Sequence, residues 1–382
     1  MKIHCTKKLL DELKLKPEEV QGEEVPLFSW HANVLFVNRR KTVVFSNDHN
    51  RYIIVLHGLK VKDFKKLDEL FVQAVRVAFQ QESIKEEIID QYLEQAKEIS
   101  FAKTKDRTTV ARMNKSCEHV TYCEDLFTND VLFQSKVSKR ASQFLVGQGK
   151  KDYIVPAEEL YKDLEEFAGG PIFSSKAVEM LVTLKLEKHH VWRRLVVPAN
   201  RTFAEFHNIL QIAFGWKDQH LYEYYLFDPE TTGYDNWDIN HGSHKDGYKP
   251  ILNIVCDEKD LEHEMDVPKK LDSEVHLSDY MSAKIKYHYD FGDSWQVYID
   301  FVKEVPDYSL NHPICLEGEG SAPPEDVGGE GGFEEFLAVI SDPKHPDYFQ
   351  TSEWGLFQGY NEFNLDRINR GLMKGVLMPI LS

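Results

Sequence analysis

Short apolar runs alternate with polar turns near the start of the chain. Val, Ile and Phe are concentrated in residues 31–37, 42–46 and 51–57, and turns containing Asn and Asp separate these runs. Such spacing predicts an antiparallel meander. After Gly58 the apolar residues recur three and four positions apart, which predicts one helix around residues 64–78 and a second around residues 84–93. A strand-then-helix order of this kind indicates an α+β domain.

The second half of the chain also combines the alternating pattern of strands with the three- and four-residue spacing of helices. Residues 177–186 and 191–197 are typical of strands, and Thr202 precedes a helical apolar stripe that ends before Gly215. A strand is predicted at residues 221–227. Residues 285–289 and 295–301 alternate apolar and polar side chains around a Gly-containing turn, which predicts a hairpin. The last clear helical stripe covers residues 333–340 and ends at Asp342-Pro343.

Length favours more than one core, because 382 residues exceed what a single ordinary domain holds. We predict two α+β domains, each a mostly antiparallel sheet with packed helices. Residues 1–127 form the first domain, residues 128–174 form a connector, and residues 175–382 form the second domain.

Charge divides unequally between the two halves. Residues 1–126 carry 21 Lys and Arg against 20 Asp and Glu, so the net charge of −17 lies almost entirely in the rest of the chain. Residues 304–353 alone hold 12 acids and one base, Lys344. This density repels phosphate, which makes nucleic acid an unfavourable partner for the C-terminal domain and favours a basic protein partner.

Cysteine usage and hydropathy bear on the compartment. The five cysteines contain no Cys-x-x-Cys pair, and an odd, scattered set suits a reducing environment. The N-terminus has no apolar core of signal-peptide length, and no apolar run is long enough to span a bilayer. We predict a cytoplasmic protein without a membrane segment.

Two acidic bends carry the most suggestive chemistry. Asp290 and Asp293 flank Phe291-Gly292, and Glu325 and Asp326 precede Val327-Gly328-Gly329. Together they are candidates for a hard divalent cation that activates water. The alternative is structural: Asp293 accepts hydrogen bonds from its own turn, and Asp290 is an exposed strand end. Further candidate ligand-binding residues are His220, Trp295 and His345. Packing or a structural hydrogen bond is the alternative for His220, and a place in the core is the alternative for Trp295.

Basic residues in the N-terminal half form a candidate anion site, with a solvated charged face as the alternative. They are Arg39, Arg40, Lys103, Lys105 and Arg107. A weaker zinc candidate combines His241 and His244 with Asp235 and Asp238 in a polar loop.

Several separated motifs between residues 177 and 368 resemble the plasmid pRiA4b ORF-3-like family, also labelled transposon-passenger TnpR-like. They include Trp192-Arg193-Arg194, Ala213-Phe214-Gly215-Trp216, the two acidic bends and Asp342-Pro343-Lys344-His345-Pro346. Residues 30–127 resemble an uncharacterised domain that accompanies this family in bacteria. The family pattern places His or Cys at positions held here by Tyr222, Val297, Ala322 and Val327, so the resemblance implies that a His/Cys transition-metal site is not retained. Neither resemblance implies an established activity.

No complete set of catalytic residues is apparent, so we expect a non-catalytic interaction module whose acidic C-terminal face binds a basic protein. A hydrolase or nuclease that depends on a hard metal, using Asp290, Asp293, Glu325 and Asp326, is the first alternative. A nucleic-acid-associated protein linked to mobile elements is the second. A divalent cation is the cofactor that these residues would accept.

Overall fold

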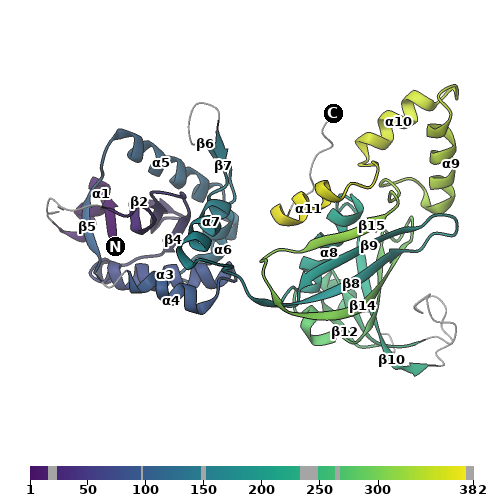
Figure 1. Cartoon of the computed structure of the whole chain (residues 1–382), viewed down its shortest axis with the longest axis horizontal. Coiled ribbons are helices and arrows are strands. Elements are labelled where there is room, and N and C mark those ends of the chain that lie inside the picture. Colours follow the sequence, from purple (N-terminus) through teal and green to yellow (C-terminus); the bar gives the residue numbers. More distant parts are fainter. Residues whose placement is uncertain (16–23, 96–97, 148–151, 233–247, 263–266, 376–382) are drawn as a thin grey trace. The chain divides into compact units, whose positions relative to one another are not determined.

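The structure is a computed structural model that describes residues 1–15, 24–95, 98–147, 152–232, 248–262 and 267–375. The chain divides into two compact units, Met1–Ser174 and Ser175–Ser382 (Figure 1). Each unit combines a sheet with packed helices, which confirms the predicted α+β class. In the described part of the chain, no helix has both the length and the apolar character needed to cross a membrane.

A five-stranded sheet forms the centre of the N-terminal unit, in the order β4-β3-β2-β1-β5. Its strands are β1 (Lys2–Cys5), β2 (Ser29–Val37), β3 (Arg40–Asn47), β4 (Ile53–His57) and β5 (Ser100–Lys103). β2, β3 and β4 pair antiparallel, which confirms the predicted meander. β1 lies between β2 and β5 and is parallel to both, so this sheet is mixed.

Alternation along the strands gives this sheet two apolar faces. Val43 and Phe45 of β3 pack in one core with α3 (Leu67–Gln81) and α7 (Pro156–Ala168). Val44 packs on the opposite face with α5 (Arg107–Thr121) and α6 (Ser135–Ala141). The residues predicted as a connector thus include α6 and α7, whose apolar side chains complete the N-terminal cores. The unit also contains α1 (Lys7–Leu13), α2 (Val61–Phe64), α4 (Glu86–Glu94), β6 (Val146–Gly147), β7 (Tyr153–Ile154) and two short 3-10 helices, Pro26–Phe28 and Glu124–Leu126, among its described residues.

An eight-stranded sheet organises the C-terminal unit, in the order β12-β11-β10-β13-β14-β8-β9-β15. Its strands are β8 (Ser175–Leu184), β9 (Val191–Pro198), β10 (Tyr222–Thr232), β11 (Tyr248–Val255), β12 (Lys269–Leu271), β13 (Lys284–Tyr289), β14 (Trp295–Tyr308) and β15 (Ile314–Glu319). Only β11 and β12 pair parallel among these strands. The predicted hairpin is β13–β14, in which Tyr289 pairs with Trp295.

Helix α8 (Phe203–Phe214) positions the loop of residues 215–221, which contains His220. Thr202 caps its first turn by accepting a hydrogen bond from the N–H of Glu205, and Gly215 ends it in a left-handed conformation. Phe203 and Phe206 pack into the main core of the unit. The chain then runs through residues 215–221 to β10, past the end of the β13–β14 hairpin. Three helices follow β15, namely α9 (Gly329–Ser341), α10 (Tyr348–Phe357) and α11 (Leu365–Lys374).

Two neighbouring glycines in the first turn of α9 test this packing. A Cβ at Gly332 would lie 1.8 Å from the carbonyl oxygen of Val327, whereas one at Gly331 would meet nothing within 4 Å. We expect Gly332→Ala to lower the free energy of unfolding by about 2 kcal/mol or more, because the backbone must shift. Gly331→Ala should be neutral or stabilising by about 0.5 kcal/mol. Chemical denaturation of both variants checks this, and equal stabilities would contradict the described turn.

Candidate functional site

The turn of the β13–β14 hairpin is built around Asp290. Its carboxylate Oδ1 accepts hydrogen bonds from the backbone N–H groups of Gly292 at 2.9 Å and Asp293 at 3.2 Å. Asp290 has a φ of 55° and is only 5% exposed. The structural alternative is therefore wrong about this residue, because Asp290 is the buried acceptor of the turn rather than an exposed strand end. Its second oxygen, Oδ2, remains directed at His220.

Asp293 joins this turn to the second acidic bend. Its Oδ2 accepts a hydrogen bond from the N–H of Gly328 at 3.1 Å. A Cβ at Gly329 would lie 3.3 Å from the carbonyl oxygen of Asp293, at a φ of 69° that favours glycine. The glycines therefore permit the close approach of two bends that are about 35 residues apart in the chain. Asp293 is a structural tie in this arrangement.

His220 lies where the two bends meet. Its Nε2 is 3.0 Å from Asp326 Oδ1, 3.5 Å from Asp290 Oδ2 and 3.9 Å from Glu325 Oε2. The imidazole is 29% exposed and the side chain of Asp326 is 50% exposed, so one side of the group faces solvent. One ring nitrogen thus faces three carboxylates.

Glu325 is the most constrained member of the group. It is 0% exposed, and its Oε1 accepts hydrogen bonds from the hydroxyl of Tyr289 at 2.8 Å and the backbone N–H of Lys217 at 2.7 Å. Its Oε2 is buried and has no hydrogen-bond donor among the described residues. Burial raises the pKa of Glu325 above its usual value, against the opposing effect of these two donors.

The geometry suits a small cation. The ligand atoms of His220, Asp290 and Asp326 lie within 4.8 Å of one another, and Glu325 Oε2 borders this group at 3.9 Å from His220 Nε2. Two ligands about 2.1 Å from one ion in a tetrahedral arrangement are about 3.4 Å apart, close to the 3.5 Å and 3.0 Å that separate His220 Nε2 from the oxygens of Asp290 and Asp326. Glu325 Oε2, at 3.9 Å from the same nitrogen, would have to move closer to the ion. A dication there would compensate up to three carboxylates.

The other predicted ligand-binding residues lie elsewhere. Trp295 is 2% exposed and belongs to the main core. His345 lies in the turn between α9 and α10, where its Nδ1 accepts a hydrogen bond from the N–H of Asp347. His241, His244, Asp235 and Asp238 lie outside the described residues. Sequence reasoning missed the hydroxyl of Tyr289 and the N–H of Lys217, because alternation marked Tyr289 only as a core residue and a backbone donor leaves no sequence signal.

The basic residues predicted to bind an anion do not share one site. Arg39 and Arg40 lie at the β2–β3 turn, where the guanidinium of Arg40 donates to the carbonyl of Asn129. Lys103 ends β5, and Arg107 begins α5 as an exposed residue. Lys105 is occupied by two carboxylates, Glu24 at 2.5 Å and Asp48 at 2.7 Å.

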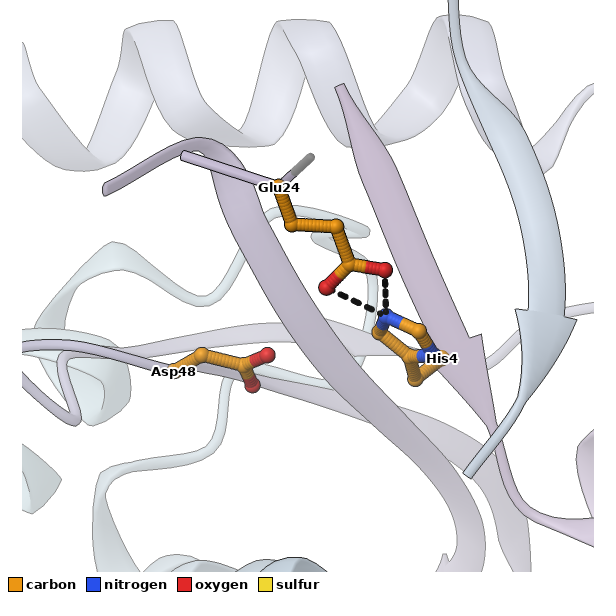
Figure 2. Close-up of side chains that lie close together, drawn as sticks. All are labelled: His4, Glu24 and Asp48. Carbon is orange, nitrogen blue, oxygen red and sulfur yellow. Dashed lines mark hydrogen bonds and ion pairs between the residues drawn. The ribbon is translucent and has the colours of Figure 1, made fainter. Parts of the chain in front are cut away.

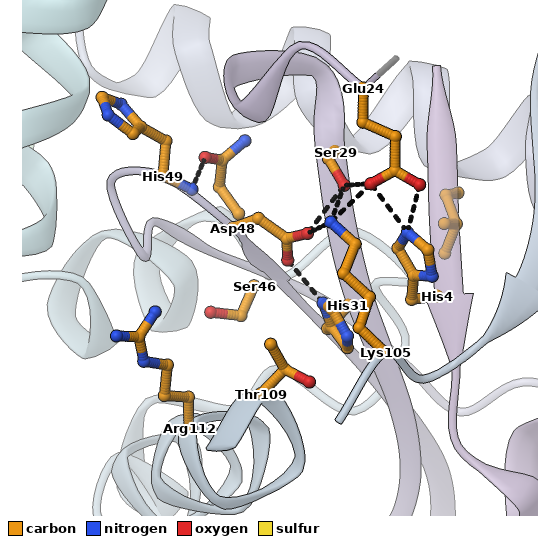
Figure 3. Close-up of polar contacts among 12 residues, drawn as sticks. His4, Glu24, Ser29, His31, Ser46, Asp48, His49, Lys105, Thr109 and Arg112 are labelled. Atoms are coloured by element: carbon orange, nitrogen blue, oxygen red, sulfur yellow. Dashed lines mark hydrogen bonds and ion pairs between the residues drawn. The ribbon is translucent and has the colours of Figure 1, made fainter. Parts of the chain in front are cut away.

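Lys105 neutralises a second group of side chains that otherwise resembles a metal site. The ligand atoms of His4, Glu24 and Asp48 lie within 4.8 Å of one another, and Figure 2 shows Glu24 directed at His4 with Asp48 beside them. Figure 3 shows the ammonium of Lys105 between the two carboxylates. Burial opposes ionisation, but hydrogen bonds from Lys105 and Lys2 lower the pKa of Glu24 to about 2. The lysine supplies the positive charge that a metal ion would bring.

Comparison with known proteins finds a matching family model for each unit. Residues 176–371, half of the chain, match the model of the family described as plasmid pRiA4b ORF-3-like protein. The chain belongs to this family. Residues 2–159 match a domain of unknown function, DUF6933. Both matches agree with the resemblances seen in the sequence.

Two relatives of the pRiA4b ORF-3-like unit are themselves without an assigned activity. The uncharacterized protein y4hQ of Sinorhizobium fredii is 30% identical over 200 residues, which cover 52% of this chain and 91% of y4hQ. A crystal structure of a protein of unknown function from Methanosarcina mazei, MM3350, is also 30% identical; it covers 50% of this chain and 97% of its own, with a TM-score of 0.38.

Glu325 makes the stability of the pRiA4b ORF-3-like unit depend on pH in a specific way. Because the folded-state pKa of Glu325 lies above its usual 4.5, the stability from its neutral form is fully present below about pH 4.5 and is lost as pH rises through the folded-state pKa. We expect Glu325→Gln, measured in a metal chelator, to be at least as stable as the wild type at pH 7. This relative advantage should disappear below pH 4.5.

Denaturant titrations at several pH values measure this difference. The control is Glu334→Gln on α9, whose carboxylate is paired with Lys188 and His189 at the surface and should show no such advantage. A loss of more than about 1 kcal/mol for Glu325→Gln at pH 7 would contradict the account.

Proposed function

We propose that the C-terminal unit binds a divalent cation through His220, Asp290, Glu325 and Asp326. The observation that carries this proposal is the carboxylate of Glu325, which is 0% exposed and has one oxygen without a donor among the described residues. Burying a carboxylate oxygen without a partner costs several kcal/mol. A bound cation removes that cost, because it supplies the missing positive charge.

Protonation of His220 is a weaker way to compensate the same charges. One Nε2–H group donates to one acceptor well, and Asp326 at 3.0 Å is the nearest. Glu325 Oε2, at 3.9 Å, lies beyond hydrogen-bond distance. An imidazolium would therefore leave the buried oxygen of Glu325 without a hydrogen bond.

The donor set favours a first-row metal such as Mn²⁺ or Zn²⁺. An imidazole nitrogen suits zinc and its neighbours, and carboxylate oxygens suit manganese and magnesium. Calcium needs six to eight oxygen ligands, more than these residues provide. The sequence alone suggested oxygen ligands, so His220 changes the preferred ion.

The exposed side of the group leaves room for water or a ligand on the ion, next to Asp326. A cation with an open position is able to polarise such a ligand, so hydrolysis that depends on the metal is the second candidate function. Cation binding is the function we put forward first, because these side chains argue for an ion directly and for no particular substrate.

The acidic docking surface and a link to nucleic acid stay predictions. Some of the acids counted in residues 304–353 already have partners in the chain. Glu317 pairs with Arg194, and Glu334 pairs with Lys188 and His189. Glu325 is buried. The charge available to a basic partner is therefore smaller than the composition suggests.

Calorimetric titration of chelator-treated protein with Mn²⁺ and Zn²⁺ tests the proposal. We expect one ion per chain for the wild type at this site. Glu325→Gln should weaken binding at least tenfold, because a neutral amide replaces a charged ligand.

Glu334→Gln is the matched control, since it removes one carboxylate from the same acidic segment but outside the group. It should bind as the wild type does. Absence of binding by the wild type, or equal loss in both variants, would reject a specific site.

A further inference from the structure

A second polar site lies in the N-terminal unit, on the sheet face that α5 covers. Strand register aligns His4 of β1 with His31 of β2, and His31 with Ser46 of β3. Their neighbours Ile3 and Phe45 point into the opposite core, so alternation sends these three side chains toward α5. A row of polar groups therefore continues the apolar surface under the helix.

His31 and Asp48 form a fixed pair in this row. His31 Nδ1 donates a hydrogen bond to Asp48 Oδ1, and Asp48 Oδ2 accepts from Ser29 at 2.6 Å and Lys105 at 2.7 Å (Figure 3). The carboxylate sets the tautomer of the imidazole, which leaves Nε2 on the other side of the ring. His31 is 3% exposed, and Nε2 has no partner among the described residues.

Two arginines face the same space without a carboxylate of their own. Arg51, between β3 and β4, is 6% exposed with a φ of 69°, and Arg112 comes from α5. Neither guanidinium has a hydrogen bond or ion pair with any described residue. Burial, and then the proximity of Arg112, lower the pKa of Arg51 to about 10. The nearby Asp48 is already bound by His31, Ser29 and Lys105.

These groups line one small pocket. The pocket is open to solvent and encloses about 20 Å³, and it is lined by His31, Ser46, Asp48, Arg51, Thr109 and Arg112 among others. Thr109 belongs to the first turn of the 15-residue helix α5, whose dipole favours negative charge there. In Figure 3, Thr109 and Arg112 rise from α5 on the side where Ser46, Asp48 and His31 lie. The enclosed part has room for about one water, so an anion bound here extends into the open mouth of the pocket.

We propose that this pocket binds a tetrahedral oxyanion of the phosphate class, held by Arg51 and Arg112, with a protonated oxygen of the anion donating a hydrogen bond to His31 Nε2. Two guanidinium forks offer more donors than the two oxygens of a carboxylate accept. Phosphate oxygens match that number. The proposal is independent of the cation site in the other unit, and it uses residues other than the basic set predicted from the sequence.

Titration of the full chain with inorganic phosphate at low ionic strength tests this proposal. We expect binding of one phosphate per chain, weakened about tenfold or more by Arg112→Gln, because a charge-assisted bidentate contact is lost. The control is Arg107→Gln, which removes the same charge from the exposed first residue of the same helix. Its affinity should stay within about twofold of the wild type.

Further arms separate the sources of the anion. If O-phosphoserine binds more tightly than inorganic phosphate, the natural ligand is a phosphate monoester. If O-phosphoserine binds more weakly, the natural ligand is free phosphate. Acetate should bind far more weakly than either titrant. The imidazole ¹⁵N signal of His31, assigned with His31→Gln, should shift on addition of phosphate, which keeps the test valid should Arg112→Gln not fold. No phosphate binding at millimolar concentration, equal loss in both arginine variants, equal affinity for acetate, or an unmoved His31 signal would overturn the proposal.

Discussion

The buried carboxylate of Glu325 is the constraint on which the C-terminal site depends. Tyr289 and the N–H of Lys217 hold one of its oxygens, and these two donors come from the β13–β14 hairpin and the α8–β10 loop. The same contact therefore joins three segments and turns the second oxygen toward His220. Packing of α8 and closure of the hairpin explain why the residue is buried. What they leave is a charge that the described protein compensates incompletely.

The two units solve a similar electrostatic problem in different ways. In the N-terminal unit, Glu24 and Asp48 share the ammonium of Lys105, so their negative charge is balanced by the chain itself. In the C-terminal unit, His220 is the only basic side chain that the structure places within 4 Å of Glu325 and Asp326 among the described residues. This contrast is the reason for assigning a cation to one group and not to the other. Near Asp48 the imbalance is reversed, because the guanidinium groups of Arg51 and Arg112 have no hydrogen bond or ion pair with any residue that the structure describes.

Sequence reasoning succeeded where a pattern is local. Apolar alternation located the meander and the β13–β14 hairpin, and the motifs identified the family. It failed where the structure depends on distant pairing: β1 contributes only four residues and pairs with strands that begin at Ser29 and Ser100. It also assigned the turn acceptor to Asp293 instead of Asp290, because either acid can accept the hydrogen bonds of such a turn and only the second bend, whose Gly328 N–H binds Asp293, decides between them. The sequence around Arg51 gives no sign that this arginine is buried and lies near Arg112.

Crystals grown with Mn²⁺ and measured for anomalous scattering test the central claim most directly. The account predicts one strong anomalous peak about 2.0–2.3 Å from His220 Nε2 and Glu325 Oε2, with Asp290 and Asp326 as its further ligands. Absence of a peak there, or a peak bound only by exposed carboxylates while Glu325 Oε2 stays uncoordinated, would contradict the claim that this buried oxygen exists to hold a cation.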